Sequence, residues 1–389
     1  MSNPVLIFDA RVYMPGELLD PGWILIDGGQ ITRIGQGKPP VGFQSARLID
    51  AKGLNLLPGF IDLHVHGSNG YEVMDADPGS ILGMASFLVR HGVTSFLPTT
   101  LTATHERILS VIKAVKQASH APLGARAAIL GVHLEGPYLN PERCGAQDPG
   151  QIRRADQQEF ADYIRSGMIR LISVAPEFPE NLWLIDACKK RAITVSAGHT
   201  SANLDQMRHA ISLGLGQVTH IYNAMSPLDH REVGTVGAAL ALDELYCEMI
   251  CDNVHVHPAA QKIVVRSKGV DRVILVSDAL CCAGLPEGEY TMDQQKIFNR
   301  DGAAYLQNGS LAGSVISIDK ALKNILENSG LSLEQGWRMS SYTAAKAIHM
   351  DAIKGSIAPG KDADLVLLDE KLGVRMTIME GKIAYEVST

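Results

Sequence analysis

The sequence lacks the features that define several broad classes of protein. Its 389 residues include six cysteines, which are too scattered for a disulfide framework and have no C-x-x-C zinc spacing. The net charge is −7 and no Lys/Arg run occurs, which argues against a nucleic-acid surface. No apolar stretch approaches the ~18–20 residues of a membrane span, and the first residues carry neither a basic region nor a cleavage site. We therefore expect a soluble cytoplasmic protein with no nucleic-acid or membrane partner.

The most informative segment that is present covers residues 58–67, with the sequence Pro-Gly-Phe-Ile-Asp-Leu-His-Val-His-Gly. It is typical of a buried strand that ends in two histidines. Side chains alternate across a strand, so His64 and His66 point to the same side. Two neighbouring imidazoles at a strand end favour a shared metal ion. The alternative is a pair of histidines without any ligand role.

The rest of the chain predicts an α/β fold in two parts. Residues 1–57 and 359–389 have short strand patterns separated by turns, which predict one small β-sandwich domain built from both chain ends. Residues 58–358 alternate strands with helical patterns, which predict a (β/α)8 TIM-like barrel. A doubly wound sheet is the alternative, because a strand count alone does not close a barrel. The expected barrel strands are 58–66, 94–98, 127–134, 169–175, 193–197, 217–222, 246–250 and 272–276.

Polar side chains recur where these strands end, which is where barrel enzymes place their catalytic groups. They comprise four histidines and two carboxylates: His64, His66, Glu135, His199, His220 and Asp278. Each has a structural alternative, such as a turn cap for Glu135 or a helix cap for Asp278. Six such positions in one barrel nevertheless predict a metal-dependent site. Imidazole and carboxylate ligands suit zinc, iron(II), manganese or cobalt equally.

The whole set resembles the amidohydrolase superfamily of metal-dependent hydrolases. Residues 355–366 resemble the return of that superfamily into its small β domain, although many relatives carry a carboxylated lysine where this chain has Glu135. Four blocks are similar to the amidohydrolase family that deacetylates N-acetylglucosamine 6-phosphate. They are residues 133–140, 198–200, 219–225 and 252–256. The resemblance covers nearly the whole chain, and the Thr-His-x-Tyr-Asn-Ala-Met block is its most specific part.

This resemblance implies a role for each strand-end residue. Asp278 is expected to be the catalytic acid and base. The implied metal ligands are His64, His66, Glu135, His199 and His220. Some relatives replace the first pair by Gln-x-Asn and hold a single metal, so one or two divalent ions per subunit are expected here. If there are two, Glu135 bridges them.

The resemblance also implies a set of substrate-binding residues, namely Gln147, Asn223, Ala224, Arg231, His255, Leu311, Ala312 and Gly313. Some relatives carry His at position 147, whereas Gln147 donates a hydrogen bond without a charge, so its part in stabilising the oxyanion stays open. Arg231, or His230 beside it, is expected to bind phosphate. If Arg231 reaches in from a neighbouring subunit, a symmetric homodimer is required. The alternative for Arg231 is a solvated surface charge.

The expected reaction is therefore hydrolysis of N-acetylglucosamine 6-phosphate to glucosamine 6-phosphate and acetate, in amino-sugar catabolism or recycling. The alternatives are the galactosamine epimer, another amidohydrolase acting on a different amide, and a non-catalytic scaffold. Glu135 in place of lysine and residues 222–225 count against a different amide. Because all six strand-end positions are filled, a scaffold is disfavoured.

Overall fold

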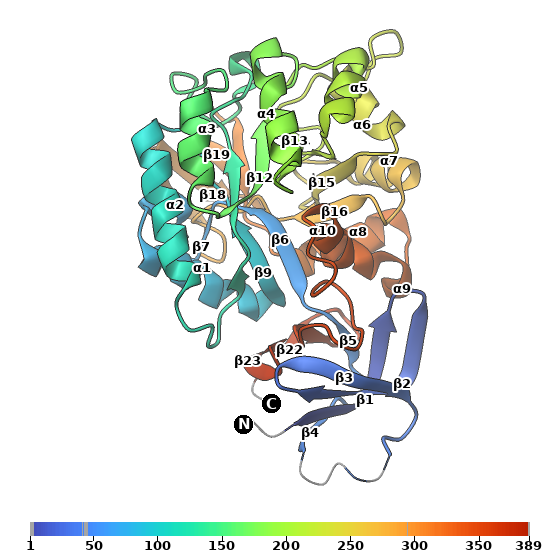
Figure 1. The fold of residues 1–389 in the computed structure, drawn as a ribbon. Helices are drawn as coiled ribbons and strands as arrows, with labels where there is room; N and C mark the ends of the chain where they lie inside the picture. Colours follow the sequence, from blue (N-terminus) through green and yellow to red (C-terminus); the bar gives the residue numbers. More distant parts are fainter. Residues whose placement is uncertain (1–3, 41, 43–45, 294, 388–389) are drawn as a thin grey trace.

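The protein is described by a computed structural model that covers residues 4–387 except 41, 43–45 and 294. Strands from both ends of the chain lie together at one end of the molecule (Figure 1). They form one eight-stranded sheet in the order β23-β22-β21-β5-β1-β2-β3, with β4 paired to β1. The strands are β1 Val5–Met14, β2 Glu17–Asp27, β3 Gln30–Gln36, β4 Arg47–Asp50, β5 Asn55–Pro58, β21 Leu365–Leu368, β22 Val374–Met379 and β23 Lys382–Glu386.

The two chain ends meet where β5 pairs antiparallel with β21. Leu57 lies opposite Val366 in this register, and the side chain of Asn55 donates a hydrogen bond to the carbonyl oxygen of Asp369. Apolar residues of both ends, including Ile24, form a common buried cluster. The strands of both chain ends therefore join in one sheet.

The middle of the chain contains eight parallel strands separated by helices, as the alternating pattern predicted. The strands are β6 Phe60–Val65, β9 Val93–Pro98, β11 Val132–Glu135, β12 Ile169–Val174, β13 Thr194–Ala197, β14 Gln217–Val218, β15 Tyr246–Ile250 and β16 Val273–Val276. β11 to β16 pair in chain order, whereas β6 pairs with β9 and β9 with the short β10 (Ala128–Ile129). This sequential order differs from that of a doubly wound sheet, in which the strand order reverses.

Seven helices connect these strands and pack around them (Figure 1). They are α1 Pro78–Leu88, α2 His105–Ser119, α3 Gln157–Ile164, α4 Pro179–Lys189, α5 Leu204–Leu213, α6 Gly234–Ala241 and α7 Pro258–Lys268. In α2, Ile108, Val111 and Val115 recur at helical spacing and are buried against the strands. At the start of α1, Asp77 caps the helix by accepting a hydrogen bond from the backbone N–H of Ser80.

A four-stranded antiparallel sheet follows β16 and was not predicted from the sequence. It consists of β17 Gly288–Met292, β18 Gln295–Arg300, β19 Ala303–Leu306 and β20 Leu311–Ser314. The backbone N–H of Leu280 donates to the carbonyl oxygen of Ser314, which places β20 beside the end of β16. Residues 311–314 therefore form an edge strand of this sheet.

The remaining elements are short, apart from α8 (Ile318–Ser329). They are β7 Gly67–Ser68, β8 Tyr71–Glu72, α9 Leu333–Gly336, α10 Tyr342–Ala347 and the 3-10 turns η1 Val73–Asp75, η2 Val89–His91, η3 Pro141–Arg143 and η4 Trp337–Ser340. Over the described ranges, the helices are all too short or too polar to cross a membrane.

Candidate active site

The predicted strand-end residues lie together at one edge of the parallel strands. His64 is in β6 with His66 just beyond it, and Glu135 ends β11. The other three are each the second residue after β13, β14 and β16. Those three, His199, His220 and Asp278, have φ angles of 48°, 32° and 49°. Residues other than glycine rarely adopt this left-handed region, because it strains the backbone. Such backbone strain persists where surrounding contacts hold it, often at functional sites.

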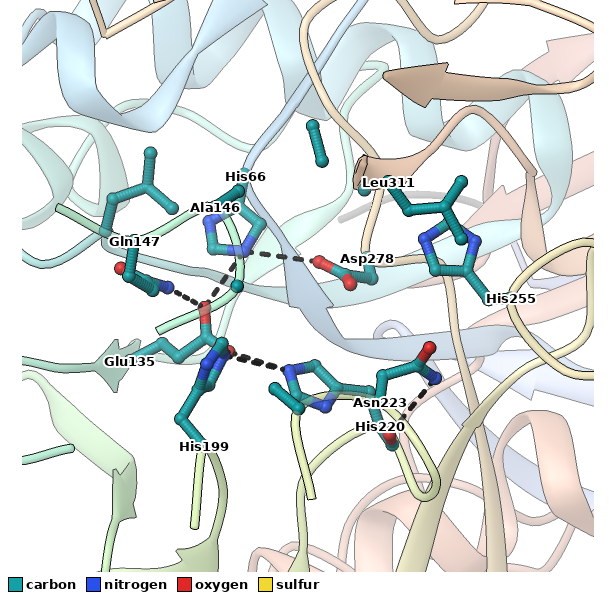
Figure 2. A pocket seen from close by; sticks show the side chains of 15 residues that line it. His66, Glu135, Ala146, Gln147, His199, His220, Asn223, His255, Asp278 and Leu311 are labelled. Carbon is teal, nitrogen blue, oxygen red and sulfur yellow. Dashed lines mark hydrogen bonds and ion pairs between the residues drawn. The ribbon is translucent and has the colours of Figure 1, made fainter. Parts of the chain in front are cut away.

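Glu135 lies at the centre of this group, and its two oxygens face different histidines (Figure 2). Its Oε1 lies 3.1 Å from Nε2 of His199 and 3.1 Å from Nε2 of His220. Its Oε2 lies 3.2 Å from Nε2 of His66, which in turn lies 3.2 Å from Nε2 of His64. Glu135 therefore has the geometry of a carboxylate shared between two sites.

The ring nitrogens that face away from Glu135 determine the tautomers of two histidines. Nδ1 of His199 lies 2.7 Å from the carbonyl oxygen of Arg143, and Nδ1 of His66 lies 3.2 Å from that of Thr99. A carbonyl oxygen only accepts, so we assign the hydrogen to Nδ1, which leaves a lone pair on Nε2 of each neutral ring. Both lone pairs face a carboxylate, an arrangement that a cation between them stabilises. The donor set therefore fits a divalent metal ion.

Three groups of three buried ligand atoms have the compactness that a metal ion requires, and one of them is His64, His133 and Glu248. The other two share Glu135. One is His64, His66 and Glu135, and the other is Glu135, His199 and His220. Within each group all ligand atoms lie within 4.8 Å of one another. Both groups consist of buried side chains that share one carboxylate, so the site can hold one divalent ion or two.

The histidines and carboxylates of the site shift one another's pKa values. Burial opposes protonation of His66, but hydrogen bonds and attraction from Asp278 and Glu135 outweigh it and raise its pKa to about 9. Burial likewise opposes ionisation of Asp278, yet the neighbouring histidines, first His64, lower its pKa to about 2. The two anionic carboxylates thus favour positive charge at the imidazoles, and a metal ion bound to the neutral rings would supply this charge in place of the protons.

A cavity of about 190 Å³ opens beside the group. His66, Glu135, His199, His220 and Asp278 line it, together with seven of the eight expected substrate-binding residues, namely Gln147, Asn223, Ala224, His255, Leu311, Ala312 and Gly313. His64 is fully buried and does not line the cavity. Arg231 is exposed on the loop between β14 and α6, outside the cavity. The structure therefore gathers all the expected residues except Arg231.

Both the oxygen and the nitrogen of the Gln147 side-chain amide form hydrogen bonds within the protein. The backbone N–H of Thr102 donates to its Oε1 at 2.6 Å, and its Nε2 donates to Oε2 of Glu135 at 2.7 Å. Because a backbone N–H only donates, the orientation of the amide is assigned without ambiguity. One hydrogen of the Nε2 group is thus directed at Glu135, and the second remains for a ligand in the cavity.

The opposite wall offers polar groups with little fixed positive charge. Nδ1 of His255 lies 2.6 Å from a carboxylate oxygen of Asp252, which raises the pKa of His255 even though its burial opposes protonation. The side-chain amide of Asn223 donates to the carbonyl oxygen of His220 at 3.3 Å. Among the described residues, neither lysine nor arginine lines the cavity.

The sequence did not identify Glu248 as a site residue. It contacts His64 on the side that faces away from the cavity. This residue lies in β15 and is fully buried, and its Oε2 is 3.0 Å from Nδ1 of His64. An acidic residue in the middle of the apolar strand 246–250 was the available signal, because a buried carboxylate needs a partner. His133 is also buried against His64, with a ring distance of 4.6 Å.

Comparison with known proteins identifies the class to which this site belongs. The sequence matches the amidohydrolase family over residues 55–384. The chain therefore belongs to the amidohydrolase family, which confirms the resemblance drawn from its motifs.

Individual relatives place it more narrowly, among the N-acetylglucosamine-6-phosphate deacetylases. The chain is 36% identical to the enzyme of that name from Bacillus subtilis (strain 168), over 99% of this chain and 98% of that protein. It is also 36% identical to the N-acetylgalactosamine-6-phosphate deacetylase of Escherichia coli O157:H7, over 85% of this chain and 87% of that protein. The crystal structure of N-acetylglucosamine-6-phosphate deacetylase from Pasteurella multocida matches with a TM-score of 0.92 at 30% identity, covering 98% of this chain and 99% of that one.

Proposed function

We propose that the protein is a metal-dependent hydrolase that removes the acetyl group of N-acetylglucosamine 6-phosphate, producing glucosamine 6-phosphate and acetate. The observation that carries this proposal is Glu135, which joins two compact ligand groups next to a cavity that Asp278 also lines. The products assign the protein to amino-sugar catabolism or recycling.

Asp278 acts as base and then as acid in this proposal. A divalent metal ion lowers the pKa of water from ~15.7 to near 7 and polarises an amide carbonyl. Asp278 is ionised and faces the cavity, so it accepts a proton from the attacking water as the new C–O bond forms. As the C–N bond breaks, the same carboxyl returns the proton to the sugar nitrogen, which leaves as a neutral amine.

Gln147 and β20 orient the substrate. The free hydrogen of the Gln147 amide is directed to the acetyl oxygen, where negative charge develops. Thr102 holds the amide in the required orientation. Leu311, Ala312 and Gly313, which form one wall of the cavity, cover the sugar ring.

The phosphate group calls for a permanent positive charge, and no lysine or arginine of the described chain lines the cavity. We assign phosphate binding to Asn223, Ala224 and His255, completed by Arg231 of the partner subunit in a symmetric homodimer. Two observations support this assignment. The exposed position of Arg231 leaves its guanidinium free to reach another subunit, and His230 beside it is exposed as well.

A closed (β/α)8 barrel formed by residues 58–358 is part of the same proposal. Isolated parallel bridges support closure, because Thr99 pairs with His133 and Val65 pairs with Ala279. These bridges link β9 to β11 and β6 to the end of β16. Residues 1–57 and 359–389 then form the small β domain, with β23 and β3 at the two ends of its strand order.

The metal and the location complete the proposal. Zinc, iron(II), manganese and cobalt all suit imidazole and carboxylate ligands.

We propose a cytoplasmic location because the six cysteines are free thiols, as is usual in a reducing compartment.

The experiment that tests this function measures acetate release by the metal-loaded protein from N-acetylglucosamine 6-phosphate and from unphosphorylated N-acetylglucosamine. Turnover of the phosphorylated sugar alone is expected. Equal turnover of both sugars would remove the phosphate assignment, and turnover of neither would contradict the proposed reaction.

The galactosamine epimer is the second candidate, favoured by the 36% identity to the N-acetylgalactosamine-6-phosphate deacetylase. The same assay with N-acetylgalactosamine 6-phosphate distinguishes the two, since the preferred epimer has the higher kcat/KM.

A further inference from the structure

Glu248 is the only carboxylate that contacts the face of His64 turned away from the cavity in the described chain. It projects from β15, whereas His64 projects from β6, and both side chains are fully buried. A buried carboxylate without a partner is strongly unfavourable, so this contact is part of how the interior is built.

Each oxygen of Glu248 has a defined partner. Its Oε1 accepts a hydrogen bond from Nε2 of Gln217 at 2.6 Å, which comes from the neighbouring strand β14. Its Oε2 lies 3.0 Å from Nδ1 of His64 and 3.4 Å from the backbone N–H of His220. Gln217 is itself fully buried, so the carboxylate is held in place from two sides.

This arrangement determines which nitrogen of His64 is available to a metal ion. An ionised carboxylate only accepts, so Nδ1 of His64 carries the hydrogen that it donates to Glu248. The lone pair of the neutral ring is then on Nε2, which lies 3.2 Å from Nε2 of His66 and 3.6 Å from Oε1 of Glu135. A partner on the second nitrogen of a histidine ligand commonly fixes its tautomer and ring orientation.

We propose that Glu248 is a positioning residue that makes His64 a ligand and thereby determines whether the protein holds a second metal ion. This inference rests on the metal-dependent chemistry of the proposed function. In the described chain, Glu248 reaches the group of Glu135, His199 and His220 only through the backbone N–H of His220 and orients none of its ligand side chains. The group of His64, His66 and Glu135 depends on it.

The test counts bound ions and does not rely on turnover. The protein is stripped of metal with a chelator and loaded with Mn²⁺ alone, and bound Mn²⁺ is measured by elemental analysis and electron paramagnetic resonance. The wild-type protein should bind two ions per subunit, with the spectrum of an exchange-coupled pair. Glu248→Gln should weaken the second ion roughly 10- to 100-fold and show the spectrum of isolated Mn²⁺ at sub-saturating metal.

Control variants separate positioning from general damage to the fold. Glu72→Gln changes another buried carboxylate, whose hydrogen bonds come from the backbone N–H of Asp293, and should keep the coupled pair. His64→Gln removes the ligand itself and should give the one-ion state. Adding Glu248→Gln to that variant should lower metal content no further, because Glu248 acts through His64.

Circular dichroism of the metal-free proteins checks folding. Glu248→Asp provides a second variant, which keeps the charge but moves the carboxylate away from His64 because its side chain is one methylene shorter. A folded Glu248→Gln or Glu248→Asp protein that keeps the coupled pair at wild-type affinity would overturn the inference, as would a wild-type protein that binds a single ion. If neither sugar phosphate is hydrolysed, the proposed function fails, yet the Mn²⁺ count still decides the role of Glu248.

Discussion

Oδ1 of Asp278 lies 3.3 Å from Nε2 of His66, and the two side chains meet at the wall of the same cavity (Figure 2). A base in this position touches both the proposed metal ligands and the space for substrate. Its role in proton transfer and the role of the histidines in metal binding can therefore be tested separately.

Asp278→Asn should retain the metal and lose turnover. The amide cannot accept the proton of the attacking water, so kcat should fall by about 10²–10⁴-fold, which is the usual contribution of an acid-base residue. Acetate release and elemental analysis on the same sample measure the two effects. An active asparagine variant would remove Asp278 from the proposed mechanism.

His199→Ala should lose metal, because its Nε2 is one of the atoms that converge on Oε1 of Glu135. His209→Ala is the matched control, since His209 is exposed on α5 of the same connection. Metal content after dialysis should fall for the first variant only. Full retention of metal by His199→Ala would contradict its assignment as a ligand.

Arg231→Ala should raise KM for the phosphorylated sugar roughly 10- to 100-fold, the usual effect of losing a hydrogen bond to a charged group. The unphosphorylated sugar should be affected much less. Arg208→Ala, another exposed arginine, serves as the control. Equal changes for both sugars would exclude phosphate as the partner of Arg231.

Gln147→Ala should reduce kcat about 10²–10³-fold if its amide stabilises the charge on the acetyl oxygen. Gln147→His provides the comparison, because an imidazole also donates a hydrogen bond and should recover much of the rate. If the alanine variant keeps the wild-type kcat, the oxyanion is stabilised elsewhere.

Glu72 should make stability depend on pH. Burial, with the charges of Asp75 and Asp293, raises its pKa from 4.5 to about 7 against opposing effects of the Asp293 backbone N–H and His66. The folded protein therefore keeps a proton that the unfolded chain has lost, so the stabilising contribution is complete below pH 4.5 and is lost as pH rises to about 7.

Thermal unfolding between pH 5 and 8 measures this effect. The Tm of Glu72→Gln relative to wild type should increase with pH, because the amide does not ionise. Glu289→Gln, at an exposed ion pair with Lys296, should show no such trend. A constant difference for Glu72→Gln would mean that Glu72 does not titrate in this range.

The sequence was sufficient to predict the parallel strands and the side chains at their ends. Alternation puts His64 and His66 on one side of β6, and the ends of parallel strands meet at one edge. Glu248 was missed because its role depends on His64 and Gln217, which come from two other strands. Such contacts leave no local pattern in the sequence.

The sheet of β17 to β20 was missed for a different reason. Its strands are partly exposed, and the polar residues Gln295 and Asn299, in register with buried Ile297, interrupt the apolar alternation that marks a buried strand. The hydrogen bond between Gln147 and Thr102 could not be predicted from the sequence either, because it joins two loops and depends on a backbone N–H.

The pairing of β5 with β21 has a consequence for synthesis of the chain. The hydrogen bond between Asn55 and Asp369 spans 314 residues. At the usual ~5–20 residues per second, a ribosome needs roughly 16–60 s to make the intervening segment. During that time the apolar β5 has an open edge, because its partner strand does not yet exist. The nascent chain is therefore exposed to strand-to-strand aggregation until β21 has been translated.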